Sequence, residues 1–471
     1  MFVGRIEELK RLTEVIQSPK QENVVIYGRR RIGKSELIKH AIGQCGLPYL
    51  YYQAKETSEA DNVESLSKLV ADQFDLGGAT FSSMEAVLAF LFDRSATPFV
   101  FVIDEYPYLR LLSDGLDSVL QNQIDQKKHS KLKLVLLGSF IDVMKDVLES
   151  SRPLYGRITL SLFLSELHYQ EAAAFYPDVS NETKLQYYAV FGGVPYYNQL
   201  IDPTRSFEDN VCRLIIDDRG TLNDFVELFL SKELRKIQNA NAVLETIATG
   251  KRRFGDMLDK LQPMFSSAQL AIVLENLMRM DLIQKTTPIN EPKTSKKTYY
   301  EIKDNFVRFH YRYVFKHSSK RSVLDPKTFY ELFVEKDFHT LYVPFVFERI
   351  AMDYLVTQNK KGAIRPPFLD IGKLWYDNPK TRTNGEFDVV ALRQDGYVVY
   401  EAKYTSAPVT DAVVEEEVRQ LSDCRVEYVQ LGFFSKSGFA LSYPQKYDLI
   451  TLNDLYAAKT MHSTHLQKGQ S

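Results

Sequence analysis

The sequence predicts an α/β protein: a parallel sheet that carries a phosphate-binding loop, then helical segments, then a second, smaller α/β domain. Three stretches lead to this prediction. Residues 24–35 join a short β-branched run to a glycine-rich loop that contains a lysine. Residues 99–105 form an apolar run that ends in two carboxylates. Residues 385–403 are two strand-like runs joined by a tight Asp-Gly turn.

The glycine-rich loop has the spacing G-x-x-x-x-G-K-S/T without a mismatch. A strand pattern, Val24 to Tyr27, precedes it, and a helical pattern follows from Glu36 to Ile42. Glycines let a backbone curl around a phosphate, and a helix N-terminus favours an anion. The loop therefore predicts a nucleotide site in which Lys34 is the catalytic cation at the β- and γ-phosphates and Ser35 binds Mg²⁺. The other residues expected to line this site are Gly28, Arg29, Arg30, Arg31, Ile32, Gly33 and Glu36.

Two carboxylates follow the apolar run from Phe99 to Ile103, which predicts a buried parallel strand. In a doubly wound sheet, ligands lie at the carboxyl ends of the strands. We therefore expect Asp104 to hold Mg²⁺ through water and Glu105 to orient the attacking water. The alternative is a strand that ends in a solvated acidic turn.

Two more strands are expected in this domain, over residues 133–138 and 158–160. Ser139 follows the first of them, at the edge where the phosphate loop and Asp104 are expected. It is a candidate for sensing the γ-phosphate; the alternative is an ordinary loop serine.

Taken together, several motifs resemble the archaeal-type ATPase family, which belongs to the AAA+/STAND-like P-loop NTPases. They are Phe2-Val3-Gly4-Arg5, the phosphate loop, the Val-Ile-Asp-Glu strand end, Leu136-Leu137-Gly138-Ser139 and Pro153-Leu154-Tyr155-Gly156-Arg157. The resemblance implies ATP as the nucleotide and an extra strand between the phosphate-loop strand and the Asp-Glu strand. It implies that Arg5 lies near the adenine and that Arg157 is an arginine finger or sensor, in cis or in trans. The alternative for Arg157 is a surface or salt-bridged arginine. Many AAA+ members have Asn where Ser139 stands.

The middle of the chain resembles the helical lid and winged helix of that family. A break at residues 191–195, with Gly193 and Pro195, interrupts the lid's helical periodicity. Residues 239–303 then read as three helices and a hairpin. The exposed positions expected on the third helix are nearly uncharged, which is weak for neutralising DNA phosphates. DNA binding and packing against protein therefore both remain open for this segment.

The hairpin near the C-terminus fits D-x₁₂-E-x-K with Asp388, Glu401 and Lys403. Glu348, on a preceding amphipathic helix, is a candidate fourth member. The three carboxylates could share a divalent metal, since hard cations prefer oxygen ligands, and Lys403 could act on a metal-bound water as a catalytic residue. This resembles the PD-(D/E)xK nuclease core, although the proline is absent. The alternative is a polar hairpin stabilised by a cross-strand Lys–Glu pair.

The expected domains are a P-loop ATPase domain (1–165), a lid (166–238), a winged helix (239–303), a helical connector (304–340), a nuclease-like domain (341–460) and a flexible tail (461–471). The formal net charge of −2 gives no global basic field, so any nucleic-acid site must be local. Three widely spaced cysteines suit a reducing compartment. With no signal peptide pattern and no long apolar run, we expect a cytoplasmic protein without a membrane partner.

The function expected from these features is a Mg²⁺-dependent ATPase whose lid and winged helix relay nucleotide state to the nuclease-like domain, which acts on DNA. Two alternatives remain. One is an ATP-regulated DNA nuclease that uses a second divalent metal. The other is a slow nucleotide switch that binds protein partners or associates with itself.

Overall fold

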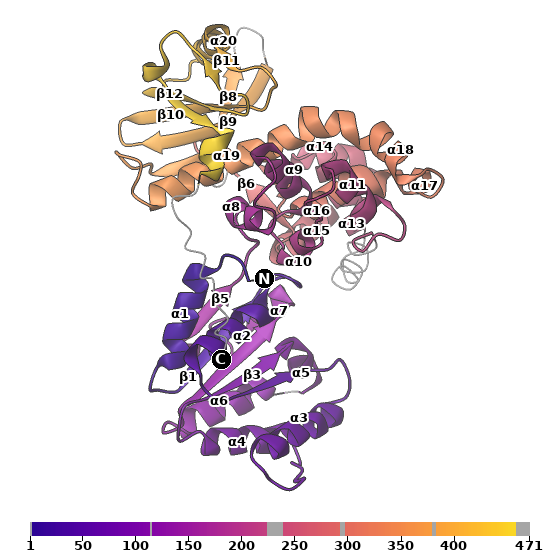
Figure 1. Ribbon diagram of the computed structural model, residues 1–471, viewed down its shortest axis with the longest axis vertical. Coiled ribbons are helices and arrows are strands. Elements are labelled where there is room, and N and C mark those ends of the chain that lie inside the picture. Colours follow the sequence, from indigo (N-terminus) through magenta and orange to yellow (C-terminus); the bar gives the residue numbers. More distant parts are fainter. Residues whose placement is uncertain (1, 114, 224–238, 293–296, 379–382, 458–471) are drawn as a thin grey trace. The chain divides into compact units, whose positions relative to one another are not determined.

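A computed structural model of the chain (Figure 1) describes residues 2–113, 115–223, 239–292, 297–378 and 383–457. The predicted tail, 461–471, and part of the predicted lid, 224–238, lie outside these residues. The chain divides into two compact units. The first unit contains residues 1–175, 193–200 and 275–282, and the second contains residues 176–192, 201–274 and 283–471.

The first unit is built on a parallel sheet whose strands follow the order β2-β3-β4-β1-β5. Because β4 lies between β1 and β3, the extra strand implied by the family resemblance is confirmed. Every residue of β3 and β4 is buried, as their largely apolar patterns predict, and Lys133 of β4 and Asp104 of β3 are buried with them. The strands are β1 (Glu22–Tyr27), β2 (Tyr49–Gln53), β3 (Phe99–Asp104), β4 (Leu132–Gly138) and β5 (Leu160–Phe163). Strand β5 begins two residues later than the expected Ile158, because its pairing with β1 starts at Leu160.

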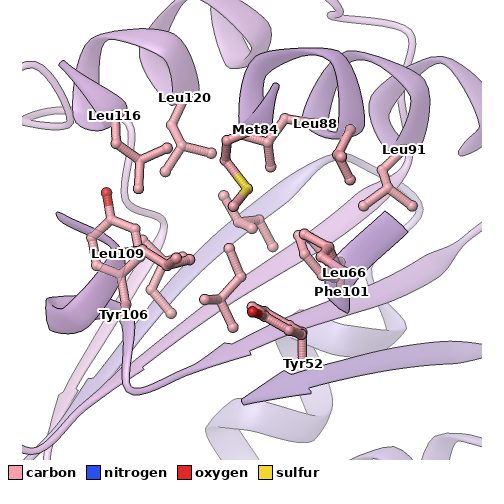
Figure 2. Packing of buried hydrophobic residues seen from close by; sticks show 14 of the residues in the cluster. Tyr52, Leu66, Met84, Leu88, Leu91, Phe101, Tyr106, Leu109, Leu116 and Leu120 are labelled. Atoms are coloured by element: carbon pink, nitrogen blue, oxygen red, sulfur yellow. The ribbon is translucent and has the colours of Figure 1, made fainter. Parts of the chain in front are cut away.

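Helices cover the sheet and bury its apolar face. Figure 2 shows leucines and a methionine of α3, α4 and α6 above Tyr52 of β2 and Phe101 of β3. Tyr106 and Leu109 of α5 complete this core. The helices of this unit are α1 (Ile6–Gln17), α2 (Lys34–Cys45), α3 (Glu59–Gln73), α4 (Met84–Arg94), α5 (Tyr106–Leu112), α6 (Leu116–Gln126), α7 (Ile141–Val147), α8 (Tyr169–Ala172) and α10 (Pro195–Gln199).

The second unit begins with helices and one small hairpin. The expected order of three helices and a hairpin is present over residues 240–302, with β6 (Ile283–Thr286) and β7 (Tyr299–Ile302) antiparallel. The helix after it buries its aromatic side chains, as expected for a core element. The helices are α9 (Asn181–Phe191), α11 (Phe207–Val211), α13 (Ala240–Ala248), α14 (Phe254–Leu261), α15 (Ser267–Arg279), α16 (Asn305–Phe309), α17 (Ser318–Arg321), α18 (Pro326–Tyr330) and α19 (Val343–Lys360), with shorter π- and 3₁₀-helical turns between them. Residues 275–279, the last part of α15, belong to the first unit.

The second unit ends in a mixed sheet of order β14-β12-β10-β9-β8. β8, β9 and β10 pair antiparallel, whereas β10, β12 and β14 pair parallel. Helix α20 packs on one face through Val414 and Leu421, and α19 packs on the other, where Tyr354 meets Phe434. The elements are β8 (Asp370–Asn378), β9 (Thr383–Arg393), β10 (Gly396–Lys403), β11 (Val409–Thr410), α20 (Asp411–Asp423), β12 (Gln430–Ser435), β13 (Phe439–Ala440), β14 (Asp448–Thr451) and α21 (Leu452–Tyr456).

Across the described ranges, none of the helices has the length and apolar character needed to cross a membrane.

Candidate functional site

The phosphate loop connects β1 to α2 and is closed around its own lysine. The Lys34 ammonium donates hydrogen bonds to the carbonyl oxygens of Gly28 (2.9 Å) and Arg29 (3.0 Å). Gly33 precedes α2 with φ of 97°, a conformation that favours glycine. A Cβ on Gly28 would lie 2.4 Å from the Leu164 carbonyl oxygen, so the loop also needs glycine there. The loop thus places a buried ammonium where the predicted nucleotide phosphates would lie.

Asp104, the last residue of β3, is hydrogen-bonded to the first turn of α2. Its Oδ2 atom accepts hydrogen bonds from the Ser35 hydroxyl (2.8 Å) and from the Tyr51 hydroxyl. Its Oδ1 atom accepts one from the backbone N–H of Glu105 (2.9 Å). A serine hydroxyl beside a carboxylate is an oxygen donor set that suits Mg²⁺. Ser35 and Asp104 are therefore brought together as the sequence predicts, and they fit the expected metal.

Glu105 stands next to Asp104 in a strained backbone conformation, with φ of 53° and ψ of 43°. A non-glycine residue held in this region is uncommon, and such strain is concentrated at functional sites. The Ser139 hydroxyl lies 2.8 and 2.6 Å from the two carboxylate oxygens of Glu105 and donates to them. Ser139, predicted to sense the nucleotide, thus fixes the orientation of the predicted catalytic carboxylate.

The other loop side chains point in different directions. The Arg31 guanidinium lies 3.9 Å from the ring centroid of Tyr196, and Arg29 lies 3.7 Å from Glu166. Arg30 donates to the Tyr108 hydroxyl (2.9 Å) and approaches Ser139 at 3.5 Å. Ile32 is buried, whereas Glu36 is exposed and lies 3.6 Å from Lys39. Through its approach to Ser139, Arg30 is linked to the Glu105–Ser139 pair.

Arg5 connects the N-terminal segment to the phosphate loop. It is buried, and its guanidinium donates to the carbonyl oxygens of Ile32 (3.4 Å) and Ser165. Its backbone N–H donates to Glu171 (3.1 Å). These contacts hold Arg5 beside the loop, and its position near the adenine stays a prediction.

Arg157 does not belong to the phosphate-loop site of its own chain. Its guanidinium pairs with Asp125 through contacts of 2.6 to 3.1 Å and donates to the Pro153 carbonyl. Its carbonyl accepts a hydrogen bond from Asn23, at the beginning of β1. The phosphate loop follows the other end of β1, so the expected role in cis is wrong: parallel strands separate the two positions. A role in trans stays a prediction.

The predicted C-terminal residues do converge. The β9–β10 register pairs Val389 with Tyr400, and Asp388 and Glu401 are the next residues along the two strands. Two negative charges close together on neighbouring strands are destabilising, and each of these two carboxylates forms an ion pair with a lysine. Lys403 lies 2.6 Å from Glu401, and Lys373 lies 2.5 Å from Asp388.

Glu348 of α19 joins this group electrostatically. Burial, and then the nearby charges of Asp388 and Glu401, raise its pKa to about 8. Burial also raises the pKa of Glu401, against the effect of Lys403. Within the described ranges, no three carboxylate, imidazole or thiol groups lie close enough to hold a metal ion. We call Glu348, Asp388, Glu401 and Lys403, with Lys373, the C-terminal cluster.

Comparisons with known proteins agree with the phosphate-loop fold of the first unit. A model of the family described as an ATPase domain predominantly from Archaea matches residues 2–199. An uncharacterised protein of Methanocaldococcus jannaschii is 32% identical over 399 residues, which is 84% of this chain and 85% of that protein. The chain belongs to the archaeal ATPase family. A second family model, of archaeal and bacterial proteins of unknown function, matches residues 310–420.

Solved structures show that this archaeal ATPase has a known fold. The Walker-type ATPase of Pyrococcus abyssi is 20% identical, with a TM-score of 0.51, over 66% of this chain and 96% of that one. The ORC2 protein of Aeropyrum pernix is 15% identical, with a TM-score of 0.42, over 68% of this chain and 94% of that one. The first of these supports the α/β P-loop fold.

Several residues at the phosphate-loop site and at the C-terminal cluster were missed in the sequence. Tyr51 lies in the middle of β2, and its contact with Asp104 follows from the β2–β3 pairing, which the sequence does not reveal. Lys373 lies where the β8–β9 register shifts between Gly372 and Leu374, and such a bulge re-aims a side chain. Glu417 of α20 is buried, and burial followed by the charge of Glu401 raises its pKa to about 7. Glu417 is one of three consecutive glutamates in α20, and nothing in the sequence distinguishes it from its neighbours.

The segment that contains Gly193 and Pro195 packs tightly in the first unit. Gly193 donates its backbone N–H to Glu166 (3.1 Å), and its carbonyl accepts from Leu167 (2.9 Å). A Cβ on Gly193 would lie 1.9 Å from the Leu167 carbonyl oxygen. A Cβ on Gly33 would lie 3.9 Å from the Pro195 ring, so this segment also borders the phosphate loop.

Gly193→Ala is therefore expected to lower the free energy of unfolding by about 1–3 kcal/mol, because backbone atoms must move apart. The matched control is Gly43→Ala in the last turn of α2, where a Cβ meets nothing within 4 Å. That change is expected to stabilise the helix by about 0.5–1 kcal/mol. Denaturant unfolding of both variants tests the difference. Equal stabilities would show that the Gly193 contact is not as close as described.

Proposed function

We propose that this archaeal ATPase hydrolyses Mg²⁺-bound ATP at the phosphate loop and couples its nucleotide state to the second unit, which acts on DNA. The observation that carries the proposal is the continuous contact from Ser35 to Asp104 and on to Glu105 and Ser139. It sets a metal-binding pair beside a rigidly held carboxylate at the carboxyl edge of the sheet.

Each residue of this group has a distinct task in the proposed reaction. Bound Mg²⁺ would neutralise charge on the β- and γ-phosphate oxygens. Ser35 and Asp104 would hold the metal, and Lys34 would leave the loop carbonyls to contact the phosphates. Glu105 would accept a hydrogen bond from the attacking water and orient it in line with the bond that breaks.

The coupling route is suggested by chain connectivity. Residues 193–200 belong to the first unit, whereas the residues on both sides of this segment belong to the second. The segment stacks Tyr196 on Arg31 of the phosphate loop. A change at the loop on nucleotide binding would therefore act directly on a segment tied at both ends to the second unit.

The second unit has two candidate DNA contacts: the proposed wing, formed by β6, β7 and the loop between them, and the C-terminal cluster. The loop after β6 donates the Ile289 N–H to the Lys373 carbonyl (2.7 Å). Asn290 forms two hydrogen bonds with the backbone of Trp375 (2.7 and 2.8 Å). These contacts cover the edge strand β8 and support a packing role for the described part of the proposed wing; residues 293–296 lie outside the described residues. We therefore assign the proposed DNA contact to the C-terminal cluster.

A metal-dependent nuclease activity of the C-terminal cluster is the second candidate function. Its support is the convergence of Asp388, Glu401 and Glu348 with two lysines. A divalent cation between the carboxylates would relieve their mutual repulsion, and would require Asp388 to move from Lys373. A slow nucleotide switch that binds protein partners remains the alternative. The Glu105 carboxylate, held by Ser139, supports ATP turnover over this switch.

Asp388→Asn tests the C-terminal cluster. We expect it to weaken Mn²⁺ binding and any cleavage of plasmid or single-stranded DNA by at least about 100-fold. Loss of a group that only orients a metal ligand already lowers metal affinity or activity by about 10–100-fold, and loss of a ligand itself should cost at least as much. ATP turnover should be unchanged. Stability should change little, because Lys373 keeps Glu386 at 3.3 Å.

The matched control is Asp395→Asn in the turn of the same hairpin, where the side chain is exposed and pairs with Arg393. It should bind Mn²⁺ as the unaltered chain does. Equal Mn²⁺ binding by Asp388→Asn and the control would refute the metal site.

A further inference from the structure

A cavity of about 340 Å³ lies within the second unit, lined by none of the residues assigned to the two sites above. It borders the C-terminal cluster through Arg252, which contacts Glu386 beside Lys373. Its walls come from the end of α13, from β7, from α16 and the π-helical turn after it, and from the start of α19. Three arginines line it, Arg252, Arg308 and Arg312, together with one carboxylate, Glu301. Ile302, Leu341 and Phe345 supply apolar wall. The lining therefore carries excess positive charge beside an apolar surface.

Two of the three arginines have carboxylate partners. Arg252 contacts Glu301 at 2.9 Å and Glu386 at 3.4 Å. Arg312 contacts both oxygens of Asp337, at 2.6 and 2.7 Å, and donates to the Ala248 carbonyl (3.0 Å). Their charges are balanced within the fold.

Arg308 differs from the other two. Its side chain is buried, with the residue only 9% exposed, and its Nη1 atom has no hydrogen-bond partner among the residues that the structure describes. Its guanidinium stacks instead on Phe345 (3.8 Å) and Tyr342 (4.4 Å). Asp337 is close enough to feel its charge but is bonded to Arg312 and to the Tyr313 hydroxyl (2.5 Å).

A buried, unpaired cation is unfavourable, and native proteins seldom keep one without a reason. Burial, reinforced by the charges of Arg349 and Arg312, lowers the pKa of Arg308 to about 10. The group is still protonated at neutral pH, so its charge needs a counter-ion. The cavity beside it has the volume of a small ligand pocket.

We propose that this cavity binds a small organic anion, with a phosphate or carboxylate group at Arg308 and an apolar body against Ile302, Leu341 and Phe345. Planar guanidinium groups bind both kinds of oxyanion through paired hydrogen bonds. The proposal is independent of ATP hydrolysis and of the C-terminal cluster.

Calorimetry on the full chain tests it, with inorganic phosphate, phenyl phosphate and benzoate as probes. The parent protein carries Lys34→Ala, so that the phosphate loop does not compete for phosphate. We expect saturable binding of phenyl phosphate, tighter than that of inorganic phosphate because the ring is buried. Comparison with benzoate tells whether phosphate or carboxylate is preferred.

Adding Arg308→Met should weaken phenyl phosphate binding by roughly tenfold or more, because a charged hydrogen-bond partner is lost. Arg308→Lys keeps the charge without the planar group and should bind with intermediate affinity, which covers the case that the methionine variant does not fold. The control is Arg219→Met, which removes an arginine of the second unit whose side chain is 88% exposed. Absent binding in the parent, equal binding by phosphate and phenyl phosphate, or equal binding in the Arg308 variants and the control would overturn the proposal.

Discussion

Lys34→Ala is expected to weaken ATP binding by more than about 100-fold, since hydrogen bonds to charged groups contribute roughly 1.5–3 kcal/mol each and this ammonium offers at least two. Its Nζ atom now donates to the carbonyl oxygens of Gly28 and Arg29. These bonds show that the ammonium lies inside the loop, where it can be transferred to phosphate oxygens. Calorimetric titration with Mg²⁺ and ATP measures the effect.

The matched control for that variant is Lys39→Ala in the same helix. Lys39 is more than half exposed and lies 3.6 Å from Glu36, so its removal should leave ATP affinity within about twofold. If Lys34→Ala bound ATP as tightly as Lys39→Ala does, the phosphate loop would not be the nucleotide site.

Glu105→Gln is expected to retain ATP binding and to lower turnover by about 10²–10⁴-fold, the usual contribution of a positioned acid–base group. The amide keeps the size of the side chain and can still accept a hydrogen bond from Ser139. What it loses is the negative charge that orients water. Single-turnover hydrolysis of ATP, measured beside equilibrium binding, separates the two effects.

Ser139→Ala provides a graded comparison. It removes the hydroxyl that holds the Glu105 carboxylate at 2.6 and 2.8 Å but leaves the carboxylate itself. We expect turnover to fall by about tenfold, less than in Glu105→Gln. Near-normal turnover in Glu105→Gln would rule out its assigned role, whatever the serine variant does.

The first unit follows from the sequence because its signals are local. β3 and β4 are buried along their whole length, and apart from Lys133 and the terminal Asp104 their residues are apolar or glycine. Carboxyl ends of parallel strands meet at one edge of the sheet, so the sequence alone predicts that Asp104 lies beside Ser35. The contact of Tyr51 with Asp104 needed the strand order, which such local signals do not contain.

Residue partners were harder to predict than residue types. The family resemblance pointed to Arg157, but nothing in the sequence indicated that Asp125 of α6 would pair with it at the opposite edge of the sheet. Similarly, the tight turn at Asp395-Gly396 fixes the register that pairs Val389 with Tyr400, the residues next to Asp388 and Glu401. Lys373 enters from another strand at a register shift, and no local pattern announces such a shift.

The measurement that tests the account most directly is steady-state ATP turnover by the full chain in Mg²⁺, with and without DNA, beside the Lys34→Ala variant. We predict Mg²⁺-dependent turnover that Lys34→Ala lacks and that DNA changes through the second unit. Turnover no higher than that of Lys34→Ala under every condition would contradict the account, and the archaeal ATPase fold would then serve as a nucleotide-binding switch.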